Sequence, residues 1–205
     1  MRKLGILLSG RGSNFEAIAD RIQQGELQAE IAVVISNIAS APGLEKARQR
    51  GLKGVFLPSK GVPREEFDRQ VVEVLRDHGV AVVCLAGFMR LLSLVLVRAF
   101  PNRILNIHPA LLPAFPGLEG QRQALEYGVK YSGCTVHFVD EGLDSGPIIL
   151  QAVVPVMDED DEHALAERIL REEHRIYAEA IRLVLNEEIE IVGRRVVRKK
   201  AKGDV

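Results

Sequence analysis

The stretch KLGILLSGRGSNFEAIADRIQQG, residues 3–25, joins an apolar run, a glycine-rich turn and a helical repeat. Residues 3–8 predict a buried β-strand, because apolar side chains dominate a run of strand length. Apolar side chains then recur at helical spacing from Phe15 to Ile22, and Gly25 is a typical helix stop. This succession is typical of the start of an α/β fold.

Strands and helices alternate in the same way through residue 107, and a loop rich in proline and glycine follows at residues 109–120. We expect strands at 31–35, 55–57, 80–85, 103–107, 134–139 and 148–156, helices at 42–50, 63–78, 122–127 and 162–185, and a hairpin of 189–192 with 195–197. Apolar strands separated by helices favour a parallel sheet. The sequence therefore predicts one α/β domain, a mostly parallel twisted sheet with helices on both faces and a Rossmann-like N-terminal half.

The composition excludes several classes of protein. The chain has 205 residues, 47% hydrophobic and 27% charged, which is typical of a globular protein rather than a disordered one. Its net charge of -1 argues against a general nucleic-acid binder, although the segment from Arg194 to Lys200 is locally basic. Cys84 and Cys134 lie in apolar runs, which excludes a disulfide scaffold and a cysteine-rich zinc site.

No apolar stretch has the length that a bilayer requires, so we expect no membrane partner. The N-terminal apolar run ends at Ser9, too early for a signal peptide. We therefore expect a cytoplasmic protein.

The turn at residues 9–14, SGRGSN, could bind an anion. Glycines allow close approach of the backbone, and a following helix offers unpaired N–H groups. It is not a dinucleotide fingerprint, because Phe15 occupies the place of the third glycine, and no lysine of a P-loop follows. Two interpretations stay open, a phosphate site and a tight turn before a capped helix. Arg64 could add a charged contact, or be a solvated surface charge.

Asn106 and His108 stand at the end of a predicted buried strand. They are two residues apart, so their side chains point to the same side in strand geometry. The carboxyl ends of parallel strands are where ligands bind in such folds. An amide and an imidazole together can stabilise an oxyanion and move protons, whereas a lone loop histidine would only bond nearby backbone.

The loop at residues 140–147, DEGLDSGP, holds three acids and two glycines. A solvated turn is the commoner explanation of such a loop. It could also supply a carboxylate to His108, and its spacing lacks the EF-hand pattern for Ca²⁺. The other histidines stand at no spacing typical of metal ligands, so we expect no metal site.

Four segments together resemble the phosphoribosylglycinamide formyltransferase family: LLSGRGSN (7–14), GFMRLLS (87–93), NIHPALLPAFPG (106–117) and TVHFVDEGLDSGPII (135–149). This family passes a formyl group from 10-formyltetrahydrofolate to the primary amine of glycinamide ribonucleotide in purine synthesis. The resemblance covers essentially the whole chain. It implies a single formyltransferase domain, with a phosphate-binding half at residues 1–107 and the folate-site loops, late strands and C-terminal helix at 108–205.

The resemblance also implies roles for individual residues. The catalytic set would be Asn106, His108 and Asp144. The ribonucleotide would contact Gly12, Ser13, Asn14, Arg64 and Glu173. The folate would contact Met89, Arg90, Leu91, Leu92, Val139, Asp140 and Leu143, with Arg90 at its glutamate end. The implied partners are two small molecules, with no metal and no nucleic acid, and the oligomeric state stays open.

One departure limits the transfer of roles. Many relatives carry histidines shortly after the FPGL segment, where this chain has Glu119, Gly120 and Gln121. The roles of those histidines do not carry over.

Other activities stay in view. A formyltetrahydrofolate deformylase would use the same Asn, His and Asp, but usually has an extra domain before the first strand. Methionyl-tRNA formyltransferase has a further C-terminal domain. A non-catalytic nucleotide-binding module would be expected to lack at least one of Asn106, His108 and Asp144.

Overall fold

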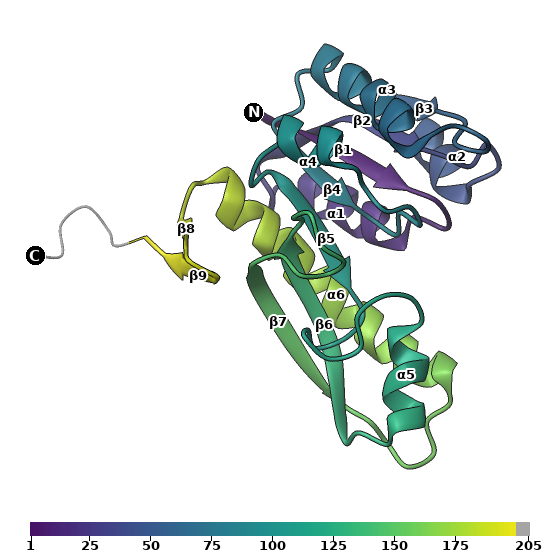
Figure 1. Ribbon diagram of the computed structural model, residues 1–205, viewed down its shortest axis with the longest axis vertical. Helices are drawn as coiled ribbons and strands as arrows, with labels where there is room; N and C mark the ends of the chain where they lie inside the picture. Colours follow the sequence, from purple (N-terminus) through teal and green to yellow (C-terminus); the bar gives the residue numbers. More distant parts are fainter. Residues whose placement is uncertain (200–205) are drawn as a thin grey trace, which may run out of the picture.

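The computed structural model describes residues 1–199 and shows a seven-stranded sheet in the order β3-β2-β1-β4-β5-β6-β7 (Figure 1). The strands are β1 (Arg2–Leu8), β2 (Ala29–Ser36), β3 (Gly54–Phe56), β4 (Val82–Leu85), β5 (Ile104–His108), β6 (Tyr131–Phe138) and β7 (Ile148–Pro155). Strands β1 to β5 pair in parallel, whereas β6 and β7 are antiparallel to their neighbours. The prediction of a mostly parallel sheet is confirmed.

Helices cover the sheet on both faces, as predicted. They are α1 (Ser13–Gln23), α2 (Pro42–Gln49), α3 (Arg64–Asp77), α4 (Leu94–Ala99), α5 (Gly120–Tyr127) and α6 (Glu162–Leu185). Alternate residues of β1 belong to two separate cores, because successive side chains of a strand point to opposite faces. Ile6 packs in the core with α1, α2 and α6, whereas Leu7 packs in the core with α3 and α4.

The main departure from the predicted elements is α4, since the sequence analysis predicted no helix or strand between residues 85 and 103. The segment has only six residues and alternates leucine with valine, so its local pattern does not indicate a helix. Its first turn is fixed by tertiary structure, because the Asp68 carboxylate accepts a hydrogen bond from the Ser93 backbone N–H. The long helix α6 has the predicted bounds.

A separate hairpin of β8 (Ile189–Val192) and β9 (Arg195–Arg198) closes the described chain, as predicted. Lys200, the last residue of the basic segment, lies outside the described residues. Within residues 1–199, no helix is both long and apolar enough to cross a membrane.

The sheet topology decides which residues meet. Strand β5 pairs with β4 on one side and with β6 on the other, and this second pairing places Asn106 opposite His137 and His108 opposite Thr135. The loop after β6 folds back toward the same place, because Pro147 accepts a hydrogen bond from the Phe138 N–H. Polar residues of β5, β6 and this loop therefore share one region.

Candidate active site

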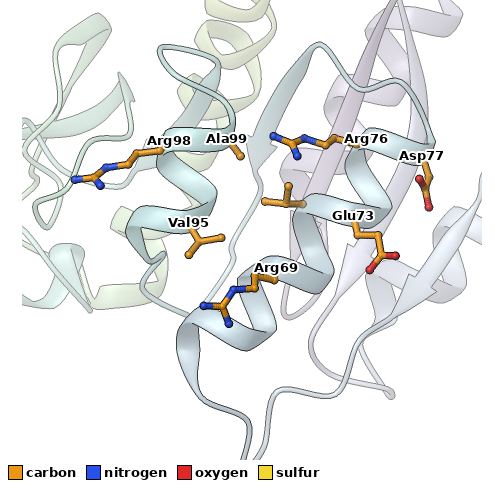
Figure 2. Close-up of a pocket in the computed structure, with 8 residues that line it drawn as sticks. Arg69, Glu73, Arg76, Asp77, Val95, Arg98 and Ala99 are labelled. Carbon is orange, nitrogen blue, oxygen red and sulfur yellow. The ribbon is translucent and has the colours of Figure 1, made fainter.

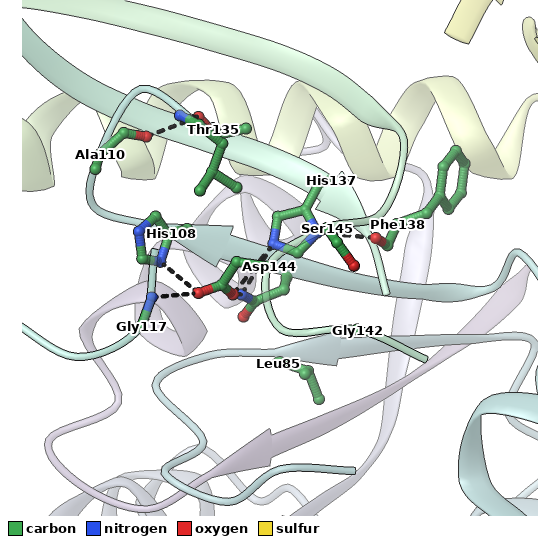
Figure 3. A network of polar contacts seen from close by, with 12 residues as sticks. Leu85, His108, Ala110, Gly117, Thr135, His137, Phe138, Gly142, Asp144 and Ser145 are labelled. Carbon is green, nitrogen blue, oxygen red and sulfur yellow. Dashed lines mark hydrogen bonds and ion pairs between the residues drawn. The ribbon is translucent and has the colours of Figure 1, made fainter. Parts of the chain in front are cut away.

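The three predicted catalytic residues lie together, and Figure 3 shows two of them, His108 and Asp144. His108 Nδ1 is 3.4 Å from Asp144 Oδ2, and Asn106 Nδ2 is 3.5 Å from Asp144 Oδ1. The side chains of His108 and Asp144 are only 4% and 11% exposed. An amide, an imidazole and a carboxylate thus share a largely enclosed space, where electrostatic interactions are stronger than in water.

The Asp144 loop has an unusual backbone that aims the carboxylate inward. Asp144 has a φ of 48°, in the left-handed region, where a non-glycine residue is uncommon. The Asp140 carboxylate accepts hydrogen bonds from Gly142 N at 3.0 Å and from Ser145 Oγ at 2.6 Å. Gly146 leaves no room for a side chain, since a Cβ would stand 1.8 Å from the Phe138 carbonyl oxygen. Because Asp140 makes these two hydrogen bonds within the loop, the Asp144 carboxylate is directed at Asn106 and His108 instead.

The His108 ring lies between two acceptors. Its Nε2 is 2.8 Å from the Phe115 carbonyl oxygen, and its Nδ1 faces the Asp144 carboxylate. A ring with protons on both nitrogens can donate to both. Gly117 N also donates to Asp144 Oδ2 at 2.8 Å, so the loop after β5 holds the carboxylate from the other side (Figure 3).

His137 is a fourth member of the cluster that the sequence interpretation missed. Its Nε2 is 3.2 Å from Asn106 Nδ2 and 3.7 Å from Asp144 Oδ1, and its Nδ1 is 2.8 Å from the Phe138 carbonyl oxygen. Burial lowers the pKa of His137, which favours a neutral ring. A neutral ring that donates through Nδ1 accepts from Asn106 through Nε2, so His137 orients the amide.

The sequence contained a usable signal for His137. It lies one strand after Asn106, and an antiparallel pairing in the observed register places the two opposite each other. The sequence interpretation considered this histidine only as a metal ligand. Among residues 1–199, no group of three or more histidines, cysteines or acids could hold a metal ion.

The glycine-rich turn precedes α1 directly. Gly12 has a φ of 73°, and a Cβ there would stand 3.0 Å from Gly43 Cα, so glycine is needed for the turn itself. As the N-cap residue of α1, Gly12 has no side chain that could accept hydrogen bonds from the first N–H groups of the helix. Unpaired N–H groups of a first helical turn are suited to an anion.

Glu173 of α6 reaches this turn. Asn14 Nδ2 donates to Glu173 Oε2 at 2.7 Å, and both side chains are buried. Burial raises the pKa of Glu173, against a smaller lowering by the bond from Asn14. Asn14 Oδ1 is buried without a partner in the described structure, so the pair has a polar atom left for a ligand. The structure thus brings Asn14 and Glu173 together, although 159 positions separate them.

Arg64 is the first residue of α3. It lines a cavity with Pro63, Glu65 and residues 92–94, and the glycine-rich turn is not part of that lining. Of these neighbours, Leu92 belongs to the segment expected to contact folate. The contact of Arg64 with the ribonucleotide phosphate stays a prediction.

Two apolar side chains of the predicted folate segment point outward, since Met89 is 68% exposed and Leu91 is 57% exposed. Leu143 of the Asp144 loop is 53% exposed, whereas Leu92 and Val139 are half-buried. Arg90 is half-buried, and its guanidinium donates to the backbone carbonyls of residues 59 and 62. A contact between Arg90 and the glutamate end of folate stays a prediction.

A second groove lies between α3 and α4 (Figure 2), and none of the predicted site residues lines it. Arg69 and Arg98 at its rim are each within ion-pair distance of exposed glutamates. These ion pairs offset part of the positive charge of the two arginines. The groove is separate from the cluster of Asn106, His108 and Asp144.

The chain matches the family model described as "Formyl transferase" over residues 2–181. It is 45% identical to phosphoribosylglycinamide formyltransferase of Escherichia coli (strain K12) over 173 residues, covering 84% of this chain and 82% of that protein. The structure of glycinamide ribonucleotide transformylase 1 from Symbiobacterium toebii is 54% identical, with a TM-score of 0.95 and coverage of 98% of this chain and 95% of that one.

A third relative is much longer than this chain. The trifunctional purine biosynthetic protein adenosine-3 of Drosophila pseudoobscura pseudoobscura is 44% identical over 207 residues, which cover all of this chain and 15% of that protein. The chain thus spans about a seventh of such relatives. The family match spans all seven strands of the main sheet and every residue of the polar cluster, so the chain belongs to the formyl transferase family.

Proposed function

We propose that the protein transfers a formyl group from 10-formyltetrahydrofolate to the primary amine of glycinamide ribonucleotide, a step of purine synthesis. The observation that carries the proposal is the enclosed cluster of Asn106, His108 and Asp144 in a member of this family. Relatives of similar length are named for this activity. Folate is the co-substrate, and the proposed chemistry needs no metal.

In the proposed mechanism, the neutral amine forms a bond to the formyl carbon, and the carbonyl oxygen becomes negative in a tetrahedral intermediate. The Asn106 amide has two N–H groups, one of which is directed at His137. The other makes only the long 3.5 Å contact to Asp144, so it is available to the developing oxyanion. A protonated His108 adds positive charge beside the same oxygen.

The Asp144 carboxylate lies 3.4 Å from His108 Nδ1, where it faces the positive charge of the ring in the intermediate and holds the ring in place. The intermediate then collapses as the bond from carbon to the folate nitrogen breaks. One proton leaves the attacking nitrogen and one is gained by the folate nitrogen, through this cluster or a water molecule. Holding both substrates together contributes much of the acceleration.

We propose that two separate sets of residues bind the two substrates. Residues 12–14 and Glu173 bind the ribonucleotide, supported by the unpaired helix N–H groups and the spare acceptor on Asn14. Segment 89–92 and the loop at 139–144 enclose the folate, supported by their exposed apolar side chains. We propose that Arg64, which lines a cavity with Leu92, and Arg90 bind the carboxylates of the folate. The proposed location of the protein is the cytoplasm.

The test is the rate of loss of the formyl group from 10-formyltetrahydrofolate, with and without glycinamide ribonucleotide. We expect loss only when the ribonucleotide is present. Loss at the same rate without it would favour a deformylase. An Arg64→Ala variant should raise the KM for the folate and leave the KM for the ribonucleotide within about twofold. A raised KM for the ribonucleotide with an unchanged KM for the folate would instead indicate that Arg64 binds the ribonucleotide phosphate.

A further inference from the structure

A buried carboxylate lies outside the polar cluster, on the inner face of α3. Asp68 is fully buried, and its Oδ2 accepts a hydrogen bond from the Ser93 backbone N–H at 2.5 Å. Ser93 is the N-cap residue of α4 and directly follows the segment 89–92 proposed to contact folate. Asp68 thus fixes one end of that segment through its backbone.

The stability of the core alone does not explain an acid at this position. The neighbouring buried residues of α3 are Phe67, Val71, Val72 and Leu75. Asp68 Oδ1 has no hydrogen-bond partner in the described structure, and burial raises the pKa of this carboxyl group. Burying an incompletely paired acid is costly, and an apolar side chain would pack with less penalty. The acid therefore has a use other than filling space.

Positive charges on the same side support the ionised form of Asp68. The hydrogen bond from Ser93 and the charges of Arg90 and Arg64 each lower the pKa of Asp68, against the larger effect of burial. Arg90 also lies over the Phe67 ring, 4.8 Å from its centroid. The same helix therefore provides the aromatic face that holds this arginine and a carboxylate that its charge influences.

These contacts secure the segment at two points and leave its middle exposed. Arg90 is tied to the backbone before α3 at residues 59 and 62, and Ser93 is tied to Asp68. Between and beside these anchors, Met89 and Leu91 present their side chains to solvent. Exposed apolar side chains on an anchored backbone form a preorganised surface for a flat apolar ligand.

We propose that Asp68 is a positioning residue that holds residues 89–92 in the shape that receives the folate co-substrate. The inference rests on the proposed function. Asp68 touches neither substrate, and acts through the backbone of Ser93 and the charge of Arg90. Its loss therefore changes the binding of one substrate only.

The experiment compares three variants by the KM for each substrate. Asp68→Leu removes the acceptor and fits an apolar face, and we expect the KM for 10-formyltetrahydrofolate to rise about 10-fold, since one buried charged hydrogen bond is lost. Asp68→Asn keeps an acceptor without the charge, and we expect a rise of about threefold. Glu73→Gln is the matched control with no expected change, because it removes a carboxylate from the exposed side of the same helix. The KM for the ribonucleotide should stay within about twofold throughout.

Equal rises in both KM values, or unchanged KM values in both Asp68 variants, would overturn the inference. If Asp68→Leu does not fold, Asp68→Asn decides the matter by the same criterion, with folding checked by thermal unfolding. The wild-type protein separates the two claims. Absence of transfer by the wild type would refute the proposed function, whereas normal wild-type transfer with no folate effect in the variants would refute only the role of Asp68.

Discussion

The substitution Asp144→Asn tests the electrostatic part of the mechanism with little change in shape. An asparagine oxygen can still accept the hydrogen bond that Gly117 N now donates at 2.8 Å. The negative charge 3.4 Å from His108 Nδ1 is lost. Coulomb's law with an effective dielectric constant of about 20 gives about 5 kcal/mol for two unit charges at this separation, and desolvation offsets part of it.

A remaining loss of about 3–4 kcal/mol corresponds to a fall in kcat of roughly 10²–10³-fold, because each 1.4 kcal/mol is a factor of ten. The assay is a single-turnover measurement of formyl transfer at saturating substrates, which separates chemistry from binding. Glu141→Gln is the matched control, since it removes a charge from the same loop, and Glu141 pairs with the exposed Arg98 rather than with the cluster. We expect its rate to stay within about twofold of the wild type.

The interpretation that Asp144 only shapes the loop predicts a different result. Asparagine adopts left-handed backbone conformations and caps turns about as well as aspartate. A folded Asp144→Asn variant with a wild-type single-turnover rate would therefore refute the electrostatic role.

Three further predictions follow from other contacts. Burial raises the folded-state pKa of Glu173, so the native state binds the proton more tightly than the unfolded state. The free energy of unfolding therefore falls as pH rises from the unfolded-state pKa through the folded-state pKa. Glu173→Gln should abolish that decline, which is measured by urea unfolding from pH 4 to 8. His137→Phe should lower kcat about 10-fold with both KM values near normal, because the amide that it orients loses its acceptor; an unchanged kcat would count against this. Arg194→Ala should lower kcat about threefold by freeing the Ser145 carbonyl, which Arg194 contacts at 2.7 Å, whereas Arg195→Ala should not; equal effects would contradict it.

The structure changes the design of one further test. A bulky side chain at Gly12 is an obvious probe of the phosphate site. Because this glycine has a φ of 73° and a Cβ would stand 3.0 Å from Gly43 Cα, such a variant would distort the turn and α2 together. Ser13→Ala removes a possible ligand at the same helix N-terminus without that strain.

Features set by local sequence could be predicted well. The strand, turn and helix of residues 3–25 and the bounds of α6 follow from periodicity and from glycine and proline positions, all of which lie within the segments themselves. The meeting of Asn106 with His108 on one side of a strand follows from the alternation of side chains. Motif resemblance placed Asp144 in the same set before any geometry was known.

Features that depend on residues distant in the sequence could not be predicted. The helix α4 depends on a carboxylate of α3, and nothing in its own six residues indicates it. The role of His137 depends on the direction and register of β6, since a shift by one residue would turn it to the other face. The neighbours of Arg64 depend on how the segment at 92–94 packs beside α3. Each of these needs a pairing between segments that local periodicity does not encode.

The central claim is that the cluster around His108 moves a formyl group between two bound substrates. Its most direct test is to label the formyl carbon of 10-formyltetrahydrofolate with ¹³C and to follow it by NMR, with wild-type protein and with His108→Ala. We expect the label to appear as a formamide on glycinamide ribonucleotide with the wild type, and to move at least about 100-fold more slowly with the variant while both substrates still bind. Release of the label as free formate by the wild type, or transfer at a near-normal rate by the variant, would contradict the account.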